Sequence, residues 1–279
     1  MTRRIGIDFV ENGMRVATVD TDDTGQTTAK IELFNAAYEQ KPDLVERDAV
    51  TVGVPDNLCQ VKPLRLSAPT ESDLRLRVEF ELAQTQLEPP ETFLYDFIST
   101  ARDDRLLGMV YRRASLAEWQ NARPLPNPLS SGSIRYRSRA TALGLGYLQY
   151  CRPFAGDLIC LADFGRSVTP VCFVYGRQVV DLARQVTVPG KQTDEIALRR
   201  QAMDLKTIVN FRLMGLADAG ITVPLSQLVV VGVSDALHSL LAEYFPIGVS
   251  CPELLPSVTV NGEVQTEAAG LVALGLTVY

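Results

Sequence analysis

The chain has 279 residues, 27 Lys and Arg against 33 Asp and Glu, and a net charge of −6 at neutral pH. This acidic balance excludes a general nucleic-acid binder, which needs excess cations to displace counterions from phosphates. Hydrophobic residues make up 46% of the chain, which excludes global disorder. The length fits one large domain or two medium ones.

The cysteines and the apolar runs indicate a cytoplasmic protein. The five cysteines are odd in number and form no C-x-x-C pair, so we expect reduced, mostly buried thiols instead of a disulfide framework. No apolar run approaches the ~20 residues that span a bilayer. The N-terminus reaches Asp8 before any apolar stretch typical of a signal peptide, and direct membrane insertion is not expected.

Strands and helices alternate along the chain. Residues 74–82 alternate apolar with polar residues as in a strand, but the capping residues 70–73 favour a helix. Ser115 opens a capping-box pattern that predicts a helix start ahead of Trp119. The expected strands are 5–9, 14–19, 31–34, 160–164, 169–174 and 178–186. The other expected helices are 138–150, 193–216, 235–244 and 266–274.

The longest predicted helix carries apolar residues at helical spacing. We expect one face of it to be buried. The residues of that expected buried stripe are Ile196, Met203, Ile208, Phe211 and Met214.

Two short motifs recur in the same order in both halves. Residues 5–9 (IGIDF) resemble 160–164 (CLADF), and residues 52–56 (VGVPD) resemble 231–235 (VGVSD). Each first motif opens a β-meander, and each second motif ends an apolar β-branched run. A matched order predicts a duplicated, β-rich α/β domain.

These motifs resemble the actin-like ATPases, and in particular the PilM family of type IV pilus assembly proteins. Residues 5–19 are similar to the family's opening hairpin, and the closing stretch 268–276 is similar to its A-x-G-L-A-L-R end. The other matching segments are 50–66, 71–100, 160–190 and 228–240. The resemblance implies an actin-like (ribonuclease H-like) duplicated two-lobe fold with a small inserted subdomain in each lobe. Lobe one would comprise 1–150, with an insert at about 71–122, and lobe two 151–279, with a helical subdomain at about 190–224.

The resemblance also implies a nucleotide cleft between two facing turns. Asp8 and Asp163 fall on the acidic positions that would organise Mg²⁺, and glycines would let backbone N–H groups reach phosphates. The nucleotide-binding positions implied in this sequence are Asp8, Asn12, Gly13, Arg15, Asp163, Gly165, Ser167, Thr169, Gly232 and Ser234.

The first turn departs from the family pattern. Val10 replaces the glycine that would touch phosphate, and Glu11 adds a negative charge beside it. The family's acidic stretch before lobe two aligns with residues 136–139, where Arg137 and Arg139 replace the acids. We therefore expect weak or lost nucleotide binding, no catalytic residue, no required cofactor, and no hydrolysis. ATP and Mg²⁺ remain the cofactors of the alternative function.

The resemblance implies a cytoplasmic adaptor of a type IV pilus, DNA-uptake or related secretion machine, peripheral to the inner membrane through its partner. Such a protein binds the cytoplasmic tail of an inner-membrane PilN-like protein and contacts pilus motor or platform components. The expected tail groove lies within about residues 71–122, between the lobe-one core and its insert. The alternatives are an active actin-like ATPase or sugar-kinase-like enzyme that uses Asp8 and Asp163 for Mg-ATP, and a filament-forming protein.

Several residues have plainer interpretations. Asp8 and Asp163 are also ordinary turn residues. His238 is the only histidine and has no evident ligand partner, so we expect a structural role. Trp119 is expected in the core or at a subdomain contact. The row Arg135, Arg137 and Arg139 is expected to be a solvated basic face.

Overall fold

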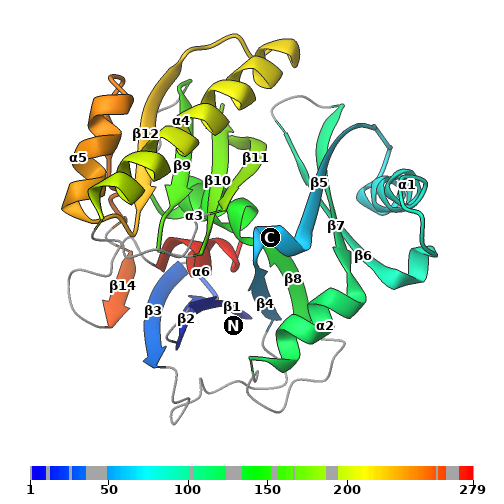
Figure 1. Cartoon of the computed structure of the whole chain (residues 1–279). Helices are drawn as coiled ribbons and strands as arrows, with labels where there is room; N and C mark the ends of the chain where they lie inside the picture. The colour runs from blue at the N-terminus through cyan, green and yellow to red at the C-terminus, as the bar shows by residue number, and fades with distance from the viewer. Residues whose placement is uncertain are drawn as a thin grey trace.

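The computed structural model is a two-lobed α/β protein with a third, smaller sheet at one side (Figure 1). It describes residues 2–10, 13–24, 27–35, 49–100, 104–123, 134–151, 156–165, 167–186, 194–255, 257–261 and 270–278. No helix in these ranges is both long and apolar enough to cross a membrane.

The lobe-one sheet has the strand order β14-β3-β2-β1-β4-β8. Its central strand β1 pairs antiparallel with β2 and parallel with β4. The bounds are β1 (Thr2–Val10), β2 (Gly13–Thr21), β3 (Thr27–Asn35), β4 (Ala49–Val54), β8 (Ile134–Ser138) and β14 (Val258–Asn261).

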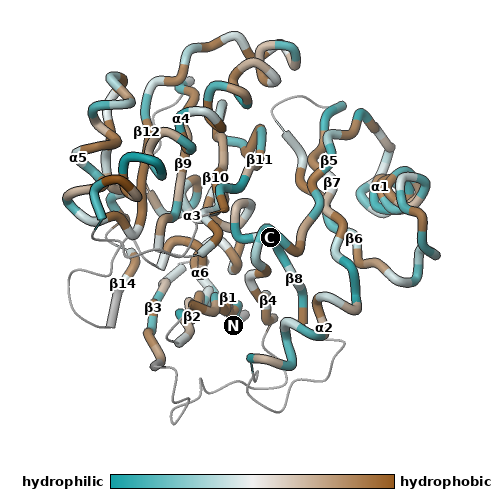
Figure 2. Tube along the Cα trace, in the orientation of Figure 1, coloured by the Kyte–Doolittle hydropathy of each residue, from teal (hydrophilic) through white to brown (hydrophobic). Residues whose placement is uncertain are grey.

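The lobe-two sheet repeats this topology, with the order β11-β10-β9-β12-β13. Here β9 pairs antiparallel with β10 and parallel with β12, as β1 does with its own neighbours. This match confirms the predicted duplication. The bounds are β9 (Leu158–Asp163), β10 (Val168–Tyr175), β11 (Gln178–Val186), β12 (Leu225–Val231) and β13 (Val249–Ser250). The apolar run of β9 fits a strand covered on both faces, and Figure 2 shows the central strands as mostly hydrophobic.

A small sheet with the order β5-β7-β6 is inserted between β4 and β8. One face packs against α1 through apolar residues such as Val78, Leu82 and Val110. The other face joins the main core through Leu107 and Met109. The bounds are η1 (Asp56–Leu58), β5 (Cys59–Arg65), α1 (Glu71–Ala83), η2 (Pro90–Thr92), β6 (Phe93–Ser99), β7 (Arg105–Arg112) and α2 (Arg113–Asn121).

Two helices cross closely between the lobes. A Cβ on Gly275 of α6 would lie 1.6 Å from the Ala142 oxygen of α3, and one on Gly146 of α3 would lie 2.3 Å from the Leu271 oxygen. Only glycine fits these two positions, because the helix backbones touch there. On the opposite face of the lobe-two sheet lie α4 and α5 (Figure 1). The bounds are α3 (Arg139–Tyr150), α4 (Glu195–Asp218), α5 (Asp235–Tyr244) and α6 (Leu271–Gly275).

The ambiguous segment at 74–82 is helical, and the Thr70 side chain caps it by accepting from the Asp73 amide at 3.1 Å. The capping-box prediction at Ser115 is wrong. Helix α2 begins at Arg113, so Ser115 lies inside the first turn, and no side chain caps this helix. Helix α6 begins at Leu271, and the predicted start at 266 lies outside the described residues.

The predicted stripe of α4 is wrong. Ile196, Met203, Phe211 and Met214 are 53–77% exposed, and Ile208 is only partly buried. The buried residues are Leu198, Ala202, Leu205, Val209 and Leu216. Trp119, in contrast, is buried and contacts the Phe9 ring edge-on at 5.8 Å, as predicted.

Candidate functional site

The first turn of the candidate cleft joins β1 to β2. Asp8 is fully buried near the end of β1, and its cross-strand partner on β2 is Arg15. Gly13 is the first residue of β2 and has a φ of +153°, a conformation that glycine tolerates. Asn12 and Glu11 lie outside the described residues. Val10, the residue in place of the expected glycine, pairs with Gly13 at the end of the ladder.

A buried ion pair joins this turn to the first residue of α3. The Arg139 guanidinium lies with Nε 3.1 Å from Asp8 Oδ1, and its Nη2 donates to the Phe9 carbonyl. Arg139 is only 7% exposed, so the expectation of a solvated face is wrong for this residue. A protein cation therefore contacts the carboxylate that the resemblance assigns to Mg²⁺.

The backbone amides of the second turn, which follows β9, donate to acceptors of the protein itself. The Gly165 amide donates to Asp163 Oδ1 at 3.1 Å, and the Phe164 amide donates to the Val231 carbonyl at 2.8 Å. Asp163 is 1% exposed. This carboxylate thus accepts from the glycine N–H that would otherwise face a phosphate.

Gly232 packs directly against this turn. Its φ is +68°, and a Cβ on it would lie 2.7 Å from the Gly165 amide nitrogen and 3.4 Å from Asp163 Oδ1. Glycine is required because any side chain would collide with the second turn. The structure thus brings together Asp163, Gly165 and Gly232, three of the predicted nucleotide-binding positions.

Arg15 extends from lobe one to the turn of lobe two. Its Nη2 lies 4.0 Å from the position that a Cβ on Gly165 would take. Arg139 thus contacts the Asp8 carboxylate, and Arg15, the cross-strand partner of Asp8, places a second guanidinium next to the second turn.

The remaining predicted site residues are more dispersed. Ser234 caps α5, accepting from the Leu237 amide at 3.3 Å. Thr169 is fully buried in β10 opposite Gln185. Ser167 is exposed beside the second turn. A hydroxyl that caps a helix already uses its acceptor, so Ser234 has a structural role of its own.

Sequence reasoning missed the residues that anchor the start of α3. Ser138 caps the Thr141 amide at 3.1 Å, and Asp56 Oδ1 accepts from the Ala140 amide at 3.1 Å. Arg184 of lobe two donates to the Asp56 carbonyl. The V-G-V-P-D motif was the available signal, because its final aspartate lies two residues after the end of β4.

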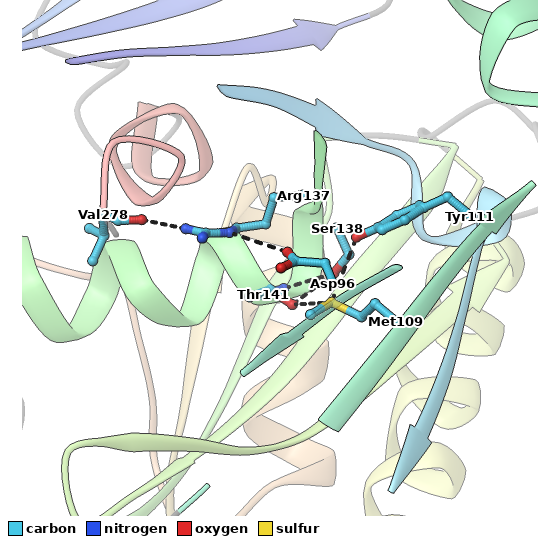
Figure 3. A network of polar contacts seen from close by, with 7 residues as sticks. All are labelled: Asp96, Met109, Tyr111, Arg137, Ser138, Thr141 and Val278. Carbon is cyan, nitrogen blue, oxygen red and sulfur yellow. Dashed lines mark hydrogen bonds and ion pairs between the residues drawn. The ribbon is translucent and has the colours of Figure 1, made fainter. Parts of the chain in front are cut away.

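A polar network links the inserted sheet to α3 and to the C-terminal segment (Figure 3). Arg137 donates to the Val278 carbonyl and lies 4.0 Å from the Asp96 carboxylate. Thr141 donates to Met109 Sδ at 3.3 Å. Burial raises the pKa of Asp96, and the neighbouring Arg137 opposes that shift. Arg137 is therefore also not a solvated surface residue, whereas Arg135 is exposed.

A cavity of about 280 Å³ is lined by η1, the start of β5, the inserted sheet and Arg184 of lobe two. Part of its wall falls within residues 71–122, the segment in which the tail groove is predicted. Its lining residues include Leu58, Gln86, Phe93, Val110 and Ser115.

The thiols and the single histidine form no reactive centre in the described part of the chain. Burial raises the pKa of Cys151 to about 12, which leaves a protonated, unreactive thiol. Four cysteines are buried and Cys251 is exposed. Among the residues that the structure describes, no group of His, Cys, Asp and Glu is arranged to hold a metal ion.

Known structures share this architecture. The chain is similar to a solved structure described as a PilM-PilN type IV pilus biogenesis complex, with 14% identity, a TM-score of 0.65 and coverage of 98% of this chain and 97% of that chain. It is also similar to a Bacteroides thetaiotaomicron protein with an actin-like ATPase fold and unknown function, with 8% identity, a TM-score of 0.52 and coverage of 96% and 95%. No family model and no curated protein match the sequence. The chain therefore has the actin-like ATPase fold, as the sequence resemblance implied.

Proposed function

We propose that this protein is a PilM-like scaffold of a type IV pilus or related secretion machine, and that it has lost nucleotide binding. The observation that carries the proposal is the buried pair of Asp8 and Arg139 within an architecture similar to the PilM-PilN complex. We also propose a cytoplasmic location, at the inner membrane through a partner.

The candidate cleft fits Mg-ATP poorly. Arg139 already neutralises Asp8, and a hydrated Mg²⁺ would have to displace a guanidinium that is held by two contacts. In the second turn the Gly165 amide already donates to the Asp163 carboxylate, and the backbone of Gly232 packs against Gly165. These contacts support a cleft that is filled by protein charges in place of a nucleotide.

The geometry supports a binding role for the insert instead. A PilN-like tail would bind in the cavity of about 280 Å³ between η1 and the insert, where Leu58 and Phe93 provide apolar wall. Extended peptides bind such grooves through anchor side chains and backbone hydrogen bonds.

Two titrations test the proposal with the full-length chain. A labelled peptide of the partner's cytoplasmic tail should bind saturably, and Leu58→Arg should abolish that binding. Leu76→Arg, on the outward face of α1 at 64% exposure, is the matched control and should leave it unchanged. Isothermal titration with Mg-ATP should give no saturable heat. Saturable ATP binding with phosphate release, or no tail binding, would refute the corresponding half of the proposal.

A further inference from the structure

Two sheets of the molecule each have a long edge strand at the same gap, β5 of the inserted sheet and β11 of the lobe-two sheet. In the described sheets β5 pairs only with β7, and β11 pairs only with β10. An unpaired edge presents a row of N–H and C=O groups to which another chain can add. Figure 1 shows β5 and β11 as neighbours at the boundary between the insert and lobe two.

The residues that line the gap give its geometry. Cys59–Val61 of β5 and Leu182–Arg184 of β11 border one cavity of about 240 Å³. Pro63–Arg65 and Val180–Asp181 border the next cavity, of about 520 Å³. Numbers rise along β5 as they fall along β11, so the two edges run antiparallel on either side of the gap.

The larger cavity has an apolar wall and a basic end. Leu64, Leu107 and Leu216 contribute apolar surface, with α4 closing one side. At the end of the strands, Arg65 and Arg105 lie directly opposite each other across the ladder. Like charges in this position are destabilising unless an anion lies between them.

The charged residues that line the cavity leave a net excess of one cation, with Arg65, Arg105 and Arg212 against Asp181 and Asp218. Asp181 is held by Arg212 at 3.5 Å. Within the described residues neither Arg65 nor Arg105 takes part in an ion pair. The cavity therefore combines strand edges, an apolar wall and two adjacent cations, which together suit an extended segment with an acidic side chain.

We propose that this gap binds an extended, acidic segment of a protein partner, which adds as a strand beside β11 and places a carboxylate between Arg65 and Arg105. The strand β11 is the favoured edge because it contains no proline, whereas Pro63 removes one donor from β5. The gap adjoins the proposed tail groove, since Cys59, Gln60 and Arg184 line both, but the larger cavity with its α4 wall belongs to the gap alone. The proposal does not depend on the proposed function.

The test uses the full chain and a random peptide display library. Enriched peptides should combine β-branched residues with Asp or Glu, and a labelled synthetic copy should bind saturably by fluorescence anisotropy. Alternate N-methylation of that peptide should abolish binding, because it removes the strand hydrogen bonds. Arg105→Glu should weaken binding by about tenfold or more. Arg200→Glu, an exposed charge on the outward face of α4, should leave it unchanged.

Arg65→Glu separates loss of binding from loss of folding. This variant converts the like-charge pair into a pair of opposite charges, so it should raise the melting temperature of the protein while lowering its affinity for the peptide. Enriched peptides without acidic residues, no enrichment at all, or full binding by the N-methylated peptide would overturn the proposal. Equal binding to Arg105→Glu and wild type, or competition by free glutamate as effective as the peptide, would also overturn it.

Discussion

Replacing Arg139 by methionine should reveal how far the candidate cleft depends on protein charges. Methionine keeps most of the side-chain volume but removes the cation that lies 3.1 Å from Asp8 Oδ1. Asp8 is fully buried, so its carboxylate would lose its nearest counter-charge without gaining water.

The distance sets the size of the effect. Two unit charges 3.1 Å apart interact by about 5 kcal/mol at an effective dielectric of 20. Part of this attraction offsets the cost of burying both groups, so removal of one partner typically costs 3–5 kcal/mol of unfolding free energy. Arg15, the cross-strand neighbour of Asp8, should keep the loss near the lower end, about 3 kcal/mol.

Urea unfolding of a double-mutant cycle measures this directly. Asp8→Asn and Arg139→Met should each be destabilising, while the double variant should lose much less than their sum, with a coupling of about 2–3 kcal/mol. Because the pair is buried, the coupling should change little with salt.

A Mg²⁺ titration tests whether the Arg139 guanidinium takes the place of a metal ion beside Asp8. Millimolar Mg²⁺ should stabilise Arg139→Met, since Asp8 would then lack its cation, but not the wild type or the double variant. A cost below about 1 kcal/mol for Arg139→Met, or equal Mg²⁺ effects in all variants, would refute the reasoning.

Three further predictions concern other contacts. Burial raises the pKa of Asp96, so the folded state holds its proton more tightly and stability should fall as pH rises from about 4 through the folded pKa. Asp96→Asn should flatten this part of the pH profile in urea unfolding, and an unchanged slope would contradict it. Gly232→Ala should cost about 1–2 kcal/mol or more, measured by thermal unfolding, because of its φ of +68° and the clash with Gly165. Arg65→Glu should stabilise by about 0.2–1 kcal/mol through the pairing with Arg105, and a lower melting temperature would contradict this.

The duplicated core was predictable because both of its signals are local. The two I-G-I-D-F-like motifs and the two V-G-V-x-D motifs record strand ends and turns, which a few residues specify on their own. The structure places each motif at an equivalent point of its lobe, at the ends of β1, β9, β4 and β12. Asp163 and Gly232 could therefore be placed at the ends of two lobe-two strands before the fold was known.

The burial of Arg139 was not predictable from the same kind of pattern. Arg135, Arg137 and Arg139 alternate along the chain, and such alternation is typical of the solvent face of a strand. Strand β8 ends at Ser138, however, and Arg139 begins α3, which turns its side chain toward Asp8, 131 positions away in sequence. A contact of that range depends on tertiary packing.

Helix α4 shows a different limit. Its buried residues follow the spacing i, i+4, i+7 and i+11 from Leu198, but Ile196, Met203 and Met214 also fall on one face. A helix with two apolar faces gives no rule for choosing between them, and the choice here falls on the face that contains the small Ala202.

The links between the lobes suggest how the two proposed binding regions are related. Arg15 extends to the second turn, and Arg184 donates to the Asp56 carbonyl beside the start of α3. Both links consist of protein side chains. The second of these links lies at the strand-addition gap, because Arg184 itself borders the smaller cavity. A ligand can shift a conformational equilibrium only by its differential affinity for the two states. Peptide binding in the gap should therefore respond to variants of Arg184 or Arg15 and remain indifferent to added Mg-ATP.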